Sequence, residues 1–259
     1  LQIFKRIVTA DNWTESDLKL EKSVVINQID QHYYTNESLA HDLIFKNSSL
    51  SYEIMGSVEN VESFGLKKIK SFKRRIFNNE NMLLCVTGNI DESSKNLIKS
   101  TFEDLNINCG MKLYNNCIPG HYFKRKPDIV FDYADWDMLD VHLAFDVSSS
   151  VSEEKINLLN CITGEGVGSR LQGVLREKLG YTADISSYTE VYEECSVIHI
   201  VYTVNKKHFT DSLKALTDTL NKMNHNICEK DICVSLPFYS DNLAFVLDDT
   251  EQMNHIIGY

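Results

Sequence analysis

The sequence predicts an α+β protein in two lobes, each a mainly antiparallel sheet covered by helices. Three observations predict this class. Apolar residues at helical spacing fill most of the first half, alternating segments mixed with helices fill the second, and a stretch rich in turn formers separates them. That stretch covers residues 106–126 and has no helical period. We therefore expect domains at 1–112 and 127–259, joined by a linker at 113–126.

Helix signals dominate the first domain. Thr14 and the acidic residues after it predict a helix N-terminus, and apolar residues then follow at helical spacing as far as Tyr33. Asn36 predicts the start of a second helix that runs to Phe45. The remaining elements expected in this domain are a basic amphipathic helix at 63–77, a buried strand at 81–88 and a helix at about 91–105.

Strands and helices are mixed in the second domain. Two strands are expected after the linker, at 129–134 and 140–148, and a helix at 152–162 leads into a glycine-rich turn. A further helix ends at Gly180. The expected elements that follow are two hairpin strands at 182–190 and 196–204, a helix at 209–223, and a helix from 229 that is interrupted near Pro237.

The charge distribution excludes one class of partner. The 259 residues include 26 Lys and Arg against 37 Asp and Glu, which gives a net charge of −11. Residues 1–120 carry 14 basic and 15 acidic side chains, so the remaining 12 basic and 22 acidic ones leave residues 121–259 at −10. Such an acidic half argues against nucleic acid as a partner. The basic run at 67–75 has helical periodicity, which favours a solvated helix face.

Cysteine usage and hydropathy indicate the compartment. The chain has 7 Cys, an odd number, and no Cys-x-x-Cys pair. Four of these cysteines lie within apolar stretches, namely Cys85, Cys161, Cys195 and Cys233. This placement favours reduced core thiols in a cytoplasmic protein over disulfides or a cysteine metal site. No apolar run is long enough to span a bilayer, so we expect no membrane contact. The missing initiator Met and the lack of a signal-peptide pattern indicate a fragment or a trimmed chain.

The most informative stretch is residues 164–181. A glycine turn at 164–168 precedes Ser169-Arg170-Leu171, the helix that follows ends in Arg-Glu-Lys-Leu-Gly at 176–180, and an alternating strand comes next. This order resembles the second-domain signature of the pitrilysin/insulinase-type zinc metallopeptidases (inverzincins), in the branch of the mitochondrial processing peptidases and bacterial processing proteases. The resemblance implies that 1–112 is the C-terminal part of a first peptidase-like domain and 127–259 the N-terminal part of a second.

Three segments of the first domain extend the resemblance, so that it covers nearly the whole chain in order. Residues 21–29 resemble the helix that supplies the third zinc ligand of the family, a glutamate. Residues 50–56 resemble the segment that leads to its Ile-x-Gly turn, and residues 81–91 resemble its Asn-Met strand with a following Gly-Asn-x-Asp turn.

The zinc motif implied by this resemblance is missing. The family binds zinc through His-x-x-Glu-His, and no such pattern occurs among the 8 His of the chain. The family helix carries two glutamates seven positions apart, which places both on one face. Here Glu21 matches the first and Gln28 stands at the third-ligand position. A neutral amide is a poor zinc ligand, so we expect no bound zinc and no catalysis by this chain alone, although an intact family member would hold zinc. The resemblance also implies that Glu21 and Gln28 face the interior of a closed chamber.

Two candidate substrate-binding residues follow from the family pattern. The arginine of Arg-Glu-Lys and a tyrosine seven residues later contact the bound peptide, and Arg176 matches the arginine. Ala183 occupies the tyrosine position, but Tyr181 lies two residues earlier, on the same face of an extended strand. The alternative for Arg176 is a cation near a helix C-terminus that complements the helix dipole.

Competing functions differ in their sequence requirements. The glycine turn is also compatible with nucleotide binding, but a helix is expected before it where a dinucleotide site needs a strand, and no lysine follows it. Two hypotheses remain. The chain is either a non-catalytic homologue that helps to enclose or bind a peptide, beside an active peptidase subunit or a second copy of itself, or a fragment of an active zinc endopeptidase.

Overall fold

The computed structural model describes residues 1–31, 36–46, 48–103, 105, 107, 127–132, 136–148, 150–192 and 195–258. Contacts between residues divide the chain into two compact units. The first comprises 1–33, 53–116 and 246–259, and the second comprises 34–52 and 117–245. The predicted linker at 113–126 lies outside the described residues, so the predicted domain boundary stays a prediction.

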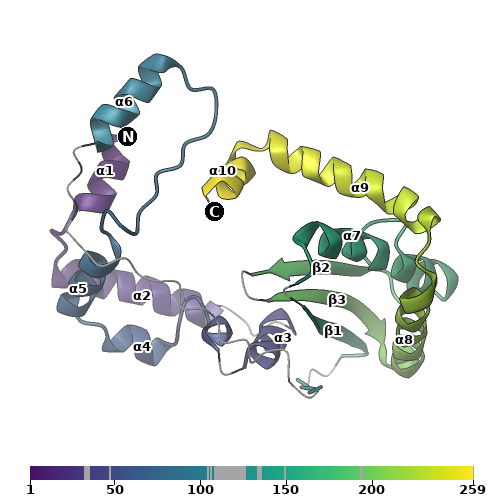
Figure 1. The fold of residues 1–259 in the computed structure, drawn as a ribbon. Coiled ribbons are helices and arrows are strands. Elements are labelled where there is room, and N and C mark those ends of the chain that lie inside the picture. Colours follow the sequence, from purple (N-terminus) through teal and green to yellow (C-terminus); the bar gives the residue numbers. More distant parts are fainter. Residues whose placement is uncertain are drawn as a thin grey trace. The chain divides into compact units, whose positions relative to one another are not determined.

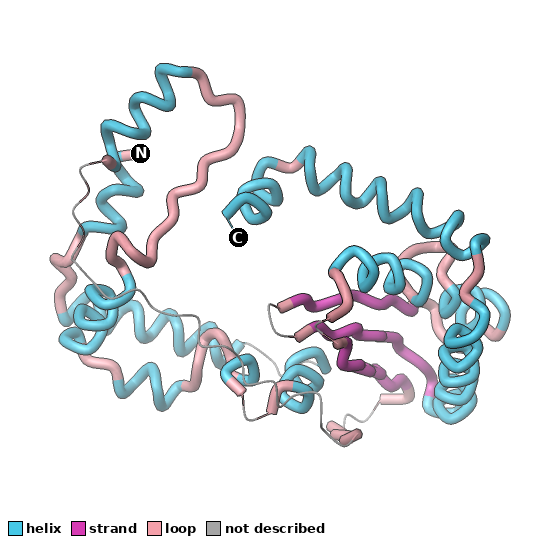
Figure 2. The backbone as a smooth tube through the Cα atoms, viewed as in Figure 1, coloured by secondary structure: helices cyan, strands magenta, loops and turns pink. Residues whose placement is uncertain are grey.

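A three-stranded antiparallel sheet forms the centre of the second unit. Its strands are β1 (Met138–Val147), β2 (Ile185–Val191) and β3 (Ser196–Asn205), in the order β1-β3-β2. Figure 2 shows these strands in magenta, with helices making up most of the remaining chain. Together with the helices, the sheet confirms the predicted α+β class, and β2 and β3 are the predicted hairpin.

The two faces of this sheet differ in polarity. One face is packed by helices α7 (Glu153–Thr163) and α8 (Phe209–Asn226) and by a π-helix at Gln172–Lys178 (Figure 1). Its buried core consists of Leu171, Leu175, Ile185, Ile200, Tyr202, Val204 and Leu216. Helix α3 (Asn36–Ile44) packs against β1 and reaches residues of the other face, where His199 and Tyr188 are paired across the strands. Apolar burial thus fixes the first face, whereas the second combines these polar and aromatic contacts with a smaller buried apolar cluster of Phe45, Cys195 and Val197.

Glycines in the turn at 164–168 permit close packing of the helices. A Cβ atom at Gly164 would lie 2.7 Å from Oγ of Ser187 on β2, which is closer than real Cβ contacts. Gly166 has φ +86°, a conformation that favours glycine, and an added Cβ atom would lie 3.1 Å from the ring of Phe238. The turn therefore serves to bring α7, β2 and α9 (Glu229–Asp248) together, which supports a structural role over phosphate binding.

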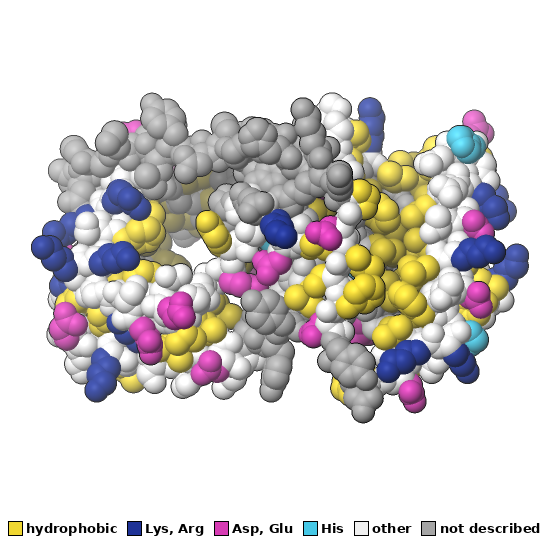
Figure 3. All heavy atoms as spheres, turned by 90° about the horizontal axis from the view of Figure 1, so that it is seen from below, with side chains coloured by type: hydrophobic (Ala, Val, Ile, Leu, Met, Phe, Trp, Pro, Cys, Tyr) yellow, Lys and Arg dark blue, Asp and Glu magenta, His cyan; other side chains and the backbone are white. Residues whose placement is uncertain are grey.

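The described elements of the first unit are helices with little buried apolar surface. They are α1 (Gln2–Thr9), α2 (Glu15–Gln31), α4 (Val58–Ser63), α5 (Leu66–Ile76), α6 (Glu92–Phe102) and α10 (Thr250–Gly258), together with the last residues of α9. Only Val61 and Ile107 are buried apolar residues among the described part of this unit. One face of the whole chain is drawn in Figure 3, where yellow apolar side chains reach the surface between charged ones.

The basic helix α5 has a structural role. Lys73 is buried, and its ammonium donates hydrogen bonds to the carbonyls of Ile7, at 3.2 Å, and Ala10 at the end of α1. The same ammonium lies 4.6 Å from the centre of the Trp13 ring. Arg74 donates to Asp11 at 2.7 Å. Helix dipole and cation–π effects both stabilise this arrangement, which accounts for part of the basic run without a nucleic-acid partner.

Two strand predictions are wrong. The segment at 82–87 forms no strand among the described residues, and Leu83 is 73% exposed rather than buried. Residues 129–132 are likewise outside any strand, with Phe131 78% exposed, while 133–134 lie outside the described residues. Apolar composition predicted burial at both places, but a strand also needs a hydrogen-bonded neighbour, and the described residues supply none here.

Helix boundaries also differ from the prediction in places. Helix α9 continues through Pro237, where an interruption was expected, and α1 was not predicted at all. The basic helix begins at Leu66, because residues 58–63 form α4 and Gly65 separates the two. None of the described helices combines the length and the apolar character needed to cross a bilayer.

Candidate functional site

Arg176 lies in the last turn of the π-helix and its side chain is exposed. Its Nη1 donates to Oε1 of Gln172 at 3.4 Å, and Nε2 of Gln172 in turn donates to the carbonyl of Ile185 at 2.8 Å. Ile185 is the first residue of β2, which is an edge strand of the sheet that the described residues form. The buried amide of Gln172 therefore holds the guanidinium near the start of an edge strand.

Tyr181 follows the helix but is engaged elsewhere. Its ring stacks on His208, with ring centres 4.8 Å apart and planes inclined by 21°, and it packs against the apolar core that includes Leu171. Among the described residues no hydrogen bond or ring contact joins Tyr181 to Arg176. The structure therefore gives the two predicted substrate-binding residues separate surroundings, and their roles remain predictions.

Glu21 and Gln28 lie on α2, and both side chains are exposed. Seven residues of α-helix turn the chain by almost two full turns, so positions 21 and 28 of α2 share one helix face. Within the part of the chain that the structure describes, no three His, Cys, Asp or Glu side chains gather into a group that could hold a metal ion. What the shared face of α2 looks onto stays a prediction.

The polar face of the sheet carries a group of titratable side chains, which we name the sheet-face cluster: His41, His142, Tyr188, Glu190 and His199. Nε2 of His142 lies 2.8 Å from Nδ1 of His199, within hydrogen-bond distance. The Tyr188 ring stacks on His199 with centres 4.6 Å apart. Oε2 of Glu190 lies 3.6 Å from Nε2 of His199 and 3.8 Å from Nε2 of His41. The cluster thereby ties α3 to the sheet.

Protonation in the sheet-face cluster is set by its neighbours. The neighbouring imidazole of His199 keeps the pKa of Glu190 below its ordinary value despite partial burial. Burial, with the nearby carboxylate of Glu37, raises the pKa of Tyr188, whose hydroxyl lies 3.2 Å from Glu37 Oε1. Glu190 is thus ionised and Tyr188 a neutral phenol at neutral pH. The arrangement suits attachment of α3, since it presents no activated nucleophile.

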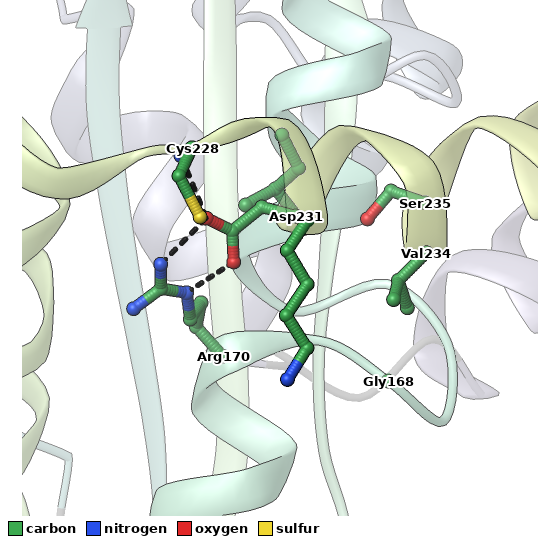
Figure 4. A pocket seen from close by; sticks show the side chains of 8 residues that line it. Gly168, Arg170, Cys228, Asp231, Val234 and Ser235 are labelled. Atoms are coloured by element: carbon green, nitrogen blue, oxygen red, sulfur yellow. Dashed lines mark hydrogen bonds and ion pairs between the residues drawn. The ribbon is translucent and has the colours of Figure 1, made fainter.

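A cavity of about 340 Å³ lies between the glycine turn and the start of α9. Its lining residues are Ile162, Gly168, Arg170, Cys228, Lys230, Asp231, Val234 and Ser235. One wall is a bidentate salt bridge, in which Nε and Nη2 of Arg170 donate to the two carboxylate oxygens of Asp231 at 2.7 and 2.6 Å (Figure 4). This pairing keeps the pKa of Asp231 well below its usual range. The pair holds α9 against the Ser-Arg-Leu segment.

A family model described as the Peptidase M16 inactive domain matches residues 63–232. The chain belongs to this family. The match includes the glycine turn, the π-helix with Arg176 and the whole three-stranded sheet. It confirms the pitrilysin/insulinase resemblance that the sequence predicted.

The proteins that this M16 chain is similar to include one described as a protease, one inactive domain and one chain of a larger complex. A Rickettsia felis protein described as an uncharacterised zinc protease is 23% identical over 265 residues, covering 100% of this chain and 63% of the relative. The crystal structure of a peptidase M16 inactive domain from Pseudomonas fluorescens has a TM-score of 0.71 at 16% identity, covering 94% of this chain and 59% of that one. A chain of complex III from Candida albicans has a TM-score of 0.65 at 13% identity, covering 93% and 64%. This chain spans less than two thirds of each of these three proteins.

The description of the Rickettsia felis relative as a zinc protease raises the question of whether this M16 chain can hold the metal. The donors that match the family helix are Glu21 and the amide of Gln28, and the histidine pair is missing from the sequence. One carboxylate and one neutral amide do not make a zinc site, since zinc in proteins is bound by three or four thiolate, imidazole or carboxylate ligands. The residues present do not fit the metal.

Sequence reasoning missed the groups that support Arg176 and Arg170. Gln172 was not recognised, although a buried glutamine four residues before Arg176 is a suitable spacing for a helix-face contact. Asp231 was also missed, because 61 residues separate it from Arg170. Of the cysteines predicted in the core, Cys161 and Cys195 are buried, Cys85 is half-buried, and Cys233 is exposed on α9. Burial and the nearby Glu165 raise the pKa of Cys161 to about 12, so its thiol is protonated.

Proposed function

We propose that this chain is a non-catalytic M16 domain that binds an extended peptide beside the edge strand β2, with Arg176 as the main contact. The observation that supports this is the placement of the guanidinium. Arg176 is exposed, yet Gln172 links it to the carbonyl of Ile185 at the start of β2. Arginine can donate hydrogen bonds to several peptide carbonyls at once, and an edge strand can add a peptide strand through its main chain.

The proposed partner is a catalytic peptidase subunit. M16 family members act with partner subunits or as multidomain proteins, as in the complex III chain and the periplasmic protease PqqL of Escherichia coli. A domain without a zinc site gains a role in proteolysis when it helps to hold the peptide for a chain that has one. A second copy of this chain would supply no zinc and is the less useful partner. We keep the cytoplasm as the proposed compartment, supported by the free thiols of the described cysteines.

A second candidate function is supported by the names of the relatives. The Rickettsia felis protein is described as a zinc protease, and it is longer than this chain. If the chain is one part of an active zinc endopeptidase, zinc ligands on the remainder of that protein would supply the metal. Arg176 would then contact peptide in the same way, so the two candidates differ in the source of the zinc and not in the role of this domain.

Substitution at Arg176 tests the proposed peptide contact. Binding of a labelled, unstructured peptide to the purified chain is measured by fluorescence anisotropy. We expect Arg176→Ala to weaken binding about tenfold, the loss of about 1.4 kcal/mol that one charge-assisted contact provides. Arg176→Lys should recover little of it, because lysine cannot reproduce the planar donor geometry.

Lys178→Ala is the matched control, since Lys178 is an exposed cation on the same helix. It should change binding less than twofold if the Arg176 contact is specific. Equal losses for Arg176→Ala and Lys178→Ala would show a general charge effect and overturn the proposed contact. Unchanged binding in Arg176→Ala together with a small loss of stability would assign Arg176 to the helix dipole instead.

A further inference from the structure

We propose that the cavity between the glycine turn and the start of α9 binds a carboxylate carried on a short apolar stem, with Lys230 and Ser235 as its polar contacts. This inference is independent of peptide binding at Arg176. It rests on the charges around the cavity, on one buried hydroxyl and on the apolar part of the lining.

Among the described residues that line the cavity, Lys230 is the cation that the paired charges leave for a ligand. Asp231 is the only carboxylate that lines the cavity in the described structure, and both of its oxygens accept from Arg170. Asp231 Oδ2 also accepts from the backbone N–H and the thiol of Cys228, at 2.9 and 3.3 Å. Its charge is therefore compensated. Lys230 and its neighbour Glu229 are both exposed, but only Lys230 lines the cavity.

Lys230 occupies a place in α9 that favours an anion. It lies in the first turn of the 20-residue helix, where the helix dipole disfavours a cation and attracts negative charge. A lysine at such a position, turned to a cavity, is stabilised when an anion binds beside it. The first-turn N–H groups of the helix add to the positive potential there.

Ser235 supplies the independent observation. Its side chain is buried, with the residue 6% exposed, yet it lines the cavity. No hydrogen-bond partner for its hydroxyl occurs among the described residues. In Figure 4 the hydroxyl points along α9 toward the turn that carries Asp231. The hydroxyl opens onto the cavity, where it is available to donate a hydrogen bond to a ligand oxygen.

Shape and polarity indicate the rest of the ligand. Ile162 and Val234 give the cavity an apolar wall, and its volume of about 340 Å³ admits a carboxylate with a few carbon atoms. Two sources carry this chemistry, namely a free short-chain acid and the C-terminal residue of a peptide. Both place an oxygen near Lys230 and Ser235 and an apolar stem near Val234.

Butyrate and its neutral analogue butyramide test the site. Each is titrated into the full chain, and amide chemical shifts are followed by NMR. We expect saturable shifts centred on Lys230 and Ser235 with butyrate and none with butyramide. Lys230→Gln should weaken butyrate binding about tenfold, and Ser235→Ala should weaken it by a smaller factor. Lys214→Gln, which removes an exposed cation from α8, is the control and should leave binding unchanged.

Two matched peptides, one with a free C-terminus and one amidated, distinguish the sources. Preference for the free acid with shifts at Lys230 and Ser235 assigns the site to peptide C-termini, whereas shifts with butyrate alone assign it to small acids. Butyrate binding that is unaffected by Lys230→Gln, or equal shifts with butyramide, overturns the proposal. If the amidated peptide binds as well as the free acid and these shifts are absent, binding at Arg176 stands and this site does not.

Discussion

The second unit is stabilised around a sheet with a packed apolar core, whereas the described part of the first unit depends on contacts between helices. Of the 17 apolar residues that are buried in the described part of the chain, 15 lie in the second unit and two, Val61 and Ile107, in the first. The first unit is instead joined by polar contacts such as Lys73 to the end of α1. Apolar side chains of its helices, such as Phe4, at 65%, and Leu97, at 57%, remain exposed.

This difference between the two units indicates which of them can provide a rigid binding surface. A close-packed core holds side chains in fixed positions, which a peptide contact such as Arg176 requires. A helical unit with a thin core has low local stability and opens more easily. The features that we connect with ligands, namely the edge strand, Arg176 and the cavity at α9, all belong to the second unit. The comparison therefore predicts large effects of core substitutions there and small ones in the first unit.

The largest effect is expected from Leu175→Ala. Leu175 is fully buried in the core of the second unit, so truncation removes apolar contacts and leaves a cavity, which costs about 2–5 kcal/mol. Leu97→Ala on α6 is the control in the first unit and should change stability by less than about 0.5 kcal/mol. Urea unfolding followed by circular dichroism measures both. Comparable losses of stability in the two variants would contradict the proposed difference between the two units.

Lys73→Met tests the polar contacts of the first unit. The substitution keeps the apolar stem but removes the donors to Ile7 and Ala10, which costs about 1.5–3 kcal/mol for hydrogen bonds from a charged group. Hydrogen exchange should speed up in α1 and not in the sheet. Lys67→Met, at an exposed position of the same helix, should leave exchange unchanged. Protection of α1 that survives Lys73→Met would show that apolar packing holds this helix.

Gly164→Ala tests the close packing of the glycine turn. The added methyl group meets Ser187 on β2, and we expect a loss of about 1–3 kcal/mol from overpacking. Gly173→Ala on the π-helix meets no atom within 4 Å, and it should be neutral or stabilising by about 0.5–1 kcal/mol. Thermal unfolding of both variants gives the contrast. A neutral Gly164→Ala would mean that the turn adapts easily and that its glycines serve another purpose.

A smaller, pH-dependent effect is expected at Asp231. Its folded pKa lies below the unfolded value of about 3.9, so the ionised pair with Arg170 stabilises the fold fully above about pH 4. That contribution is lost as the pH falls through the folded pKa. Asp231→Asn should therefore lower stability at neutral pH and flatten its decline in acid, as measured by urea unfolding at several pH values. An unchanged acid profile would show that the pair contributes nothing.

The sequence was a good guide to elements whose signals are local. Capping by Thr14 and Asp91, helical spacing and the alternation of the hairpin strands are properties of neighbouring residues, and the corresponding helices and β2–β3 form where predicted. The strand prediction for residues 82–87 was wrong because apolar composition cannot reveal whether a pairing strand is present. The helix interruption predicted near Pro237 was also wrong, since α9 continues through this residue.

The candidate site was predicted only in part, for the same reason. The resemblance pointed to Arg176, but the groups that position it depend on contacts made in space. Gln172 reaches the carbonyl of Ile185, and Arg170 pairs with Asp231 across 61 residues. Tyr181 was expected beside a peptide from strand periodicity, whereas stacking on His208 decides where its ring lies.

The central claim is that this M16 domain binds peptide without zinc. The most direct test measures binding of a labelled peptide to the metal-free chain, before and after addition of a chelator, with mass spectrometry of the peptide as a check for cleavage. We predict the same affinity with and without the chelator and an intact peptide in both cases. Binding that the chelator abolishes and zinc restores, or cleavage of the peptide by the chain alone, would contradict the claim.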